Sequence, residues 1–195
     1  ANRTNPVDGT IVMSNLCSEI LQVQQPSLLN DKQEYEVLGT DISCNLGSTN
    51  IPNLMKSPDF GKSVETMVRA LTYVTDHSSI DAVPTIKNGN DQAHTIGLGG
   101  MGLHTMFATN QMHYGSPESI EFTDIYFMLL NYYTLAASNK IAKERGEAFV
   151  NFNKSSYYTG EYFDAYTDSD VVFHSEKVKH IFEGIKVPTK EDWLQ

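Results

Sequence analysis

The chain contains few cysteines, little positive charge and no long apolar run, and each shortage excludes a class of protein. Two cysteines in 195 residues, Cys17 and Cys44, are too few for a disulfide-rich secreted domain or a four-cysteine zinc site. Lysine and arginine number 14 against 24 aspartates and glutamates, which gives a formal net charge of −10. Such an acidic chain is not expected to bind a nucleic acid polymer, because that binding needs basic patches.

Membrane and metal-binding patterns are also missing. The most apolar stretch, residues 125–137, is interrupted by Asn131 and Thr134 and is shorter than the roughly 20 residues that span a bilayer. Residues 1–6 lack the apolar core of a secretory signal. The six histidines show no metal-ligand spacing. We therefore expect a cytoplasmic protein with no membrane segment and no metal site.

The composition of the chain and its predicted secondary structure change near residue 57. Residues 1–56 are rich in asparagine, serine and glycine, which favours strands and long loops. Residues 57–195 are expected to form a helical layer, beginning at the Ser57-Pro58 start signal. The β-prone runs of the first segment are 10–13, 20–23, 35–38 and 51–54.

Within the helical layer, apolar residues from Val64 to Val74 recur at helical spacing and predict one buried stripe. A second helix is predicted over 117–145, and its middle is apolar all round, which indicates burial within a larger body. Shorter helices are expected over 155–166 and 175–185. A capping box at 189–192 predicts the start of a helix, but only residues 193–195 follow it, so we expect this chain to be a fragment of a longer protein.

The sharpest chemical pattern combines an amide, a thiol and a carboxylate. In an extended segment, Asn15, Cys17 and Glu19 would point to the same side. The amide can hydrogen-bond, the thiol can carry out one- or two-electron chemistry, and the carboxylate can accept a proton. The alternative is a strand with a buried cysteine and a glutamate in a loop.

The second cysteine leaves two interpretations open. Cys44 is followed by glycine and hydroxyl residues over 45–50, which would let the backbone approach an anion or a sugar. Equally, Cys44 fits a small core residue at the end of a strand.

These residues resemble a known family. Residues 15–20 are similar to the active-site finger of the large (alpha) subunit of class Ib aerobic ribonucleoside-diphosphate reductases. The resemblance implies an internal catalytic-core fragment of α/β class (α+β as a fragment), part of the ten-stranded α/β barrel. The strands and finger loop would come first, and the chain would be mostly helical after residue 57. The other similar stretches are 1–24, 41–48, 90–104 and 157–163.

The resemblance also implies a role for each polar residue. Cys17 would become a thiyl radical that abstracts the 3′ hydrogen of a ribonucleotide, and Glu19 would act as base on the 3′ hydroxyl. Asn15 would hydrogen-bond the substrate hydroxyls. Cys44 would be half of the dithiol that supplies reducing equivalents as the 2′ hydroxyl leaves as water. The substrate-binding residues would be Asn15, Leu16, Cys17, Ser18 and Glu19.

The partners follow from the same resemblance. The substrate would be a ribonucleoside diphosphate, and the full-length protein would be a homodimer. A small (beta) subunit with a dimanganese or diiron centre would supply the radical, and a glutaredoxin- or thioredoxin-like protein would supply the dithiol reductant. This chain would bind no cofactor itself. Without the second reductant cysteine and the radical-relaying tyrosines, the isolated chain is expected to be inactive.

Two other functions fit particular features. The G-x-G-x-x-G pattern of a Rossmann-type NAD-binding oxidoreductase occurs at Gly97, Gly99 and Gly102. That pattern normally follows a hydrophobic strand, whereas the segment before Gly97 is polar. Close packing of helices is the interpretation that we favour for these glycines. A non-catalytic helical interaction module is the other alternative, and it would leave residues 15–19 buried. The tyrosines at 157, 158, 162 and 166 are expected to pack rather than to relay a radical.

Overall fold

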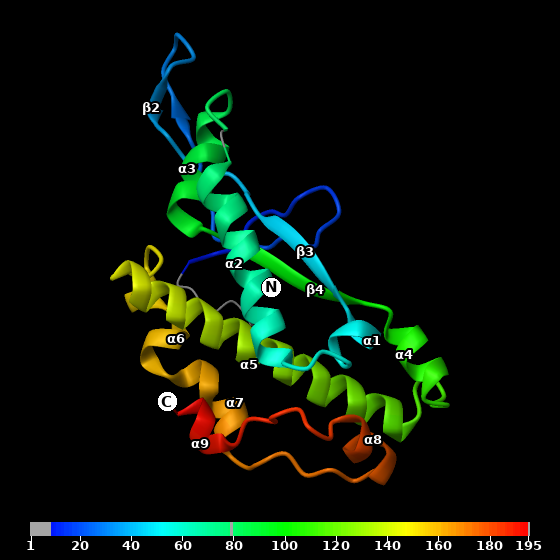
Figure 1. The fold of residues 1–195 in the computed structure, drawn as a ribbon. Coiled ribbons are helices and arrows are strands. Elements are labelled where there is room, and N and C mark those ends of the chain that lie inside the picture. The colour runs from blue at the N-terminus through cyan, green and yellow to red at the C-terminus, as the bar shows by residue number, and fades with distance from the viewer. Residues whose placement is uncertain (1–8, 79, 195) are drawn as a thin grey trace. The chain divides into compact units, whose positions relative to one another are not determined.

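The computed structural model describes residues 9–78 and 80–194, and the described chain is mainly helical (Figure 1). It divides into two compact units. The first unit comprises Ala1–Leu46, Ala70–Gly97 and Arg145–Tyr162, and the second comprises Gly47–Arg69, Leu98–Glu144 and Phe163–Gln195. The helices are α1 (Ile51–Leu54), α2 (Phe60–His77), α3 (Pro84–Ala93), α4 (Leu103–Thr109), α5 (Pro117–Arg145), α6 (Ser156–Thr159), α7 (Asp164–Thr167), α8 (Glu176–Ile181) and α9 (Lys190–Trp193), with 3-10 helices η1 (Phe152–Lys154) and η2 (Glu161–Phe163).

The strands of the described chain form two pairs. Strands β1 (Leu28–Leu29) and β2 (Tyr35–Val37) make an antiparallel hairpin, and β3 (Asn45–Asn50) pairs with β4 (Ile96–Met101). The Asn45 N–H donates to the Thr95 carbonyl at 3.4 Å, and further along, the Thr49 hydroxyl donates to the Gly99 carbonyl at 3.1 Å. Contacts thus advance in the same direction on both strands, so the pair is parallel, and helices α1 to α3 form its crossover (Figure 1).

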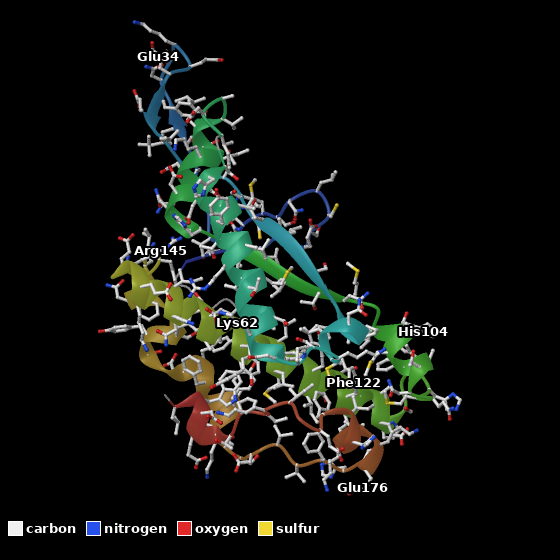
Figure 2. All side chains as sticks on the ribbon, in the orientation of Figure 1. Glu34, Lys62, His104, Phe122, Arg145 and Glu176 are labelled. Carbon is white, nitrogen blue, oxygen red and sulfur yellow. The ribbon has the colours of Figure 1, made fainter. Side chains whose placement is uncertain are left out.

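An apolar core lies along α5 in the second unit. Phe122, Tyr126 and Leu129 are each 0 % exposed, and the rings of Phe122 and Tyr126 stack with centroids 5.9 Å apart. Phe122, which lies on α5 (Figure 2), also contacts Phe182, with ring centroids 5.5 Å apart. Phe127 is 41 % exposed, so within the described chain α5 buries one side of its apolar middle.

Several helix boundaries were predictable because local signals set them. The 117–145 helix has the predicted bounds, and the capping box of α9 forms between Thr189 and Asp192. Helix α2 begins a little later than the Ser57-Pro58 signal, since the Asp59 carboxylate accepts from the Lys62 N–H at 2.8 Å. No helix among the described residues has the length and apolarity needed to cross a membrane.

Other predicted elements were wrong. Residues 51–54 form α1 rather than a strand, because the Asn50 side chain caps the Asn53 N–H and Pro52 suits the first helical turn. The runs at 10–13 and 20–23 form no strand. The helix predicted over 155–166 is broken at Gly160, whose φ of +87° is left-handed.

The glycine run at 97–102 also differs from the prediction of closely packed helices. Residues 97–101 lie within β4, and Gly102, with φ +82°, follows the strand and turns the chain into α4. A β-carbon on Gly97 would lie 2.5 Å from Cδ2 of Leu46, and one on Gly100 would lie 3.2 Å from Cδ1 of Ile51. The glycines therefore allow side chains of β3 and α1 to approach the strand closely. A dinucleotide fingerprint would instead follow a strand, so the Rossmann-type geometry is absent from this run.

Candidate active site

The segment around Cys17 is a tight turn, so the prediction of an extended strand was wrong. The Ser18 N–H donates to the Asn15 carbonyl at 3.0 Å, and the Ile20 N–H donates to Oδ1 of Asn15, also at 3.0 Å. Ser18 adopts a left-handed φ of +62°. Asparagine side chains often bond the backbone just ahead of them and so stabilise a turn against a strand. The turn removes the simple alternation of side chains on which the prediction relied.

This turn leaves its reactive groups accessible. Leu16 is fully exposed, and Cys17, Ser18 and Glu19 are exposed as well, whereas Asn15 is half-buried. The alternative of a strand with a buried cysteine does not hold, and neither does the interaction module with residues 15–19 buried in packing. The geometry presents a free thiol at the tip of a hydrogen-bonded turn.

The second cysteine lies immediately before β3 and is also a free thiol. Cys44 is half-buried, and burial raises the pKa of its thiol above the usual value. The nearby Glu19 carboxylate raises the pKa of Cys44 further by repelling the thiolate. The fold thus brings Glu19 within electrostatic range of Cys44, although the two residues lie on separate segments of the first unit.

Polar residues that the sequence analysis did not single out hold the Cys44 segment in place. The Gln22 amide donates to the Ser43 carbonyl at 2.7 Å, and the Ser43 hydroxyl donates to Oδ1 of Asn90 at 3.2 Å. Asn90 is only 4 % exposed. The one local indication that Gln22 has a specific contact was that it interrupts the β-prone apolar run at 20–23. Nothing near Asn90 in the sequence pointed to Ser43, 47 positions away.

The tyrosines near the C-terminal end of the described chain make packing contacts. The Tyr157 and Tyr162 rings lie 4.6 Å apart, and Tyr166 stacks on Trp193 at 4.2 Å. Among the described residues, no group of three or more histidine, cysteine, aspartate or glutamate side chains could hold a metal ion. A surface cavity of about 210 Å³ lies in the second unit and includes none of the predicted site residues; its lining includes Leu103, Phe107, Tyr114, Ser119, Thr123 and Asp124.

Comparisons with known proteins agree with the sequence resemblance. The family described as "Ribonucleotide reductase, barrel domain" matches residues 1–195. The chain is 43 % identical to the ribonucleoside-diphosphate reductase subunit alpha of Bacillus subtilis over 94 % of its own length and 26 % of that protein. It is 41 % identical to the corresponding subunit of Mycoplasma pneumoniae over 100 % of this chain and 28 % of the relative. The chain therefore spans about a quarter of the length of these relatives.

Proposed function

Since this chain belongs to the ribonucleotide reductase barrel-domain family along its whole length, we propose that it forms part of the catalytic core of a ribonucleoside-diphosphate reductase alpha subunit of class Ib. The mixed helices and few strands fit an α/β piece of that barrel. Residues 1–56 would supply the finger and the redox cysteine, and residues 57–195 the helical layer. The reaction would convert a ribonucleoside diphosphate to its 2′-deoxy form, a precursor of DNA.

One observation carries this proposal: an exposed thiol on a stabilised turn lies in the same unit as a carboxylate and a second thiol that interact electrostatically. Cys17, as a thiyl radical, would abstract the 3′ hydrogen, while Glu19 takes the proton of the 3′ hydroxyl. Because Cys17 is exposed, its sulfur can reach the sugar of a bound ribonucleotide. Asn15 would bond the hydroxyls, and the exposed Leu16 and Ser18 would border the substrate.

The environment of Cys44 suits a reductant. Two thiols, Cys44 and one outside this chain, would give up two electrons and two protons. The C2′–OH bond breaks, a C2′–H bond forms, and water and a disulfide are the other products. Burial and the Glu19 carboxylate raise the pKa of Cys44 and so favour its protonated form, which holds the hydrogen that the reaction consumes.

The proposal extends to partners outside this chain. A beta subunit with a dimanganese or diiron centre would supply the radical, and a glutaredoxin- or thioredoxin-like donor would reduce the disulfide. The complete alpha subunit would act as a homodimer. The 195-residue chain alone is expected to show no turnover, because it holds only one of the two reductant thiols.

The test uses an alpha subunit that carries this segment, assayed with its beta subunit and excess dithiothreitol for formation of deoxyribonucleoside diphosphate. Cys17→Ser should abolish product formation, because a hydroxyl cannot replace the thiyl radical. Glu19→Gln should lower kcat by about 100-fold or more, as expected for a lost general base. The matched control is Glu34→Gln, at an exposed site in the loop of the β1–β2 hairpin (Figure 2). Product formation by Cys17→Ser at the wild-type rate would refute the proposal.

A further inference from the structure

A glutamine links the segment that follows the finger turn to the segment that carries Cys44. Gln22 lies three residues after Glu19, and its Nε2 donates to the backbone carbonyl of Ser43 at 2.7 Å. Ser43 directly precedes Cys44. Three residues of extended chain span at most about 11 Å, so this bond restricts how far Glu19 can move from Cys44.

The Cys44 side of this link is rigidly held. Asn90 accepts from the Ser43 hydroxyl at 3.2 Å and donates to the Thr75 carbonyl at 3.1 Å. On the other side of Cys44, the Asn45 amide donates to the Thr75 hydroxyl at 2.8 Å. Asn90 and Thr75 are 4 % and 1 % exposed, so the bond between them is shielded from water, which strengthens it, and the bonds from Ser43 and Asn45 are partly shielded.

Strand β4, which lies beside the Cys44 segment, limits the space around the sulfur atom of Cys44. A β-carbon on Gly97 would lie 3.4 Å from Sγ of Cys44 and 2.5 Å from Cδ2 of Leu46. The absence of a side chain at Gly97 thus leaves just enough room for the thiol beside β4. The Cys44 segment is fixed by α2, α3 and β4, whereas residues 9–24 form no helix or strand.

We propose that Gln22 is a positioning residue that holds the finger turn, with Cys17 and Glu19, at a fixed separation from the thiol of Cys44. The inference rests on the proposed function, since it assigns Gln22 to the step in which Cys44 acts. The finger has no regular secondary structure of its own. Beyond its local turn, it is held by the Gln22 bond, and the backbone bridge between Gln25 and Thr40 follows three residues later. Loss of the link would misplace the reductant while leaving the substrate-facing tip intact.

The experiment replaces Gln22 by methionine, which has similar length and cannot donate a hydrogen bond. In the complete alpha subunit with its beta subunit, Gln22→Met should lower kcat by about threefold to tenfold, the range of one lost hydrogen bond, with KM unchanged. The second readout is the pH profile of iodoacetamide alkylation of each cysteine, followed by peptide mass spectrometry. The Cys44 profile should move to lower pH, because Glu19 is no longer held nearby, and the Cys17 profile should stay in place.

The matched control is Gln25→Met, the same change at an exposed glutamine, which should leave both readouts at wild-type values. Gln22→Leu also removes the donor, adds no charge near Cys44, and should reproduce the loss if the methionine variant folds poorly. Wild-type kcat and an unmoved Cys44 profile in either folded variant would overturn the inference, and so would failure of both to fold. Full activity of Cys17→Ser would instead refute the proposed function, while the alkylation profile would still test the Gln22 link.

Discussion

The two units of this chain bury different kinds of side chain. Among the described residues, the buried side chains of the first unit are mostly polar, and Leu71 is its one buried hydrophobic residue. The second unit buries a continuous apolar set around α5. The polar residues buried in the first unit are Thr40, Thr75, Thr85, Asn90 and Ser155.

This contrast shows how the candidate site is built. Apolar packing is non-directional, whereas a hydrogen bond fixes both distance and angle. The unit that carries Cys17 and Cys44 relies on hydrogen bonds, such as those from Asn45 and Asn90 to Thr75. The second unit supplies a stable helical body. Directional bonds suit the first unit under the proposed function, because that chemistry requires its two thiols to keep a defined geometry.

The largest expected effect tests the apolar side of the contrast. Phe122→Ala should lower the free energy of unfolding by about 3–5 kcal/mol, because it leaves a cavity among Phe107, Tyr126 and Phe182. Urea denaturation followed by circular dichroism measures the change. Phe127→Ala, at a residue that is 41 % exposed on the same helix, is the control and should cost much less. Equal losses for the two variants would contradict an apolar core along α5.

A smaller effect tests the hydrogen-bonded side. Asn90→Ala leaves the Ser43 hydroxyl and the Thr75 carbonyl without their partner and should cost about 1–3 kcal/mol. Hydrogen exchange read by mass spectrometry should show faster exchange in α3 and at the start of β3, with α5 unchanged. Asn153→Ala, at an exposed site of the same unit, should leave exchange unaltered. Uniform loss of protection across both units would remove the distinction between them.

The smallest effect concerns surface charge in the second unit. Hydrogen bonds from Lys140, at 2.9 Å, and Arg69, at 2.8 Å, lower the pKa of Glu65 to about 2 from 4.5. Because the folded pKa lies below the unfolded one, this stabilisation is full above about pH 4.5 and disappears as the pH falls through 2. Glu65→Gln should therefore lower Tm at pH 7 and have little effect near pH 2.

The control for this charge prediction is Glu176→Gln, whose side chain is 89 % exposed and lies 3.6 Å from Lys179 (Figure 2). Exposed pairs contribute little, so its Tm should match the wild type at both pH values. A loss for Glu65→Gln that is the same at pH 2 and pH 7 would show that the carboxylate acts through packing rather than charge.

Elements with local signals were predictable, and elements with distant partners were not. The bounds of α5 and the capping box at Thr189 follow from residues a few positions apart. Strand β4 was not predicted, because its glycines are explained by the close approach of the Leu46 and Ile51 side chains, and these residues are distant in sequence. The turn at Cys17 was missed for another reason: alternation assumes a strand, and the Asn15 side chain favoured a turn.

The sequence by itself determined the family, the residue types of the candidate site and the long helices, because motifs and helical periodicity are local properties of the chain. Only the tertiary structure brought Glu19 near Cys44, joined Gln22 to Ser43 and placed Asn90 between Ser43 and Thr75. These contacts join residues separated by 15 to 47 positions along the chain. Their geometry depends on how the helices and strands pack, and no spacing within one segment specifies that packing.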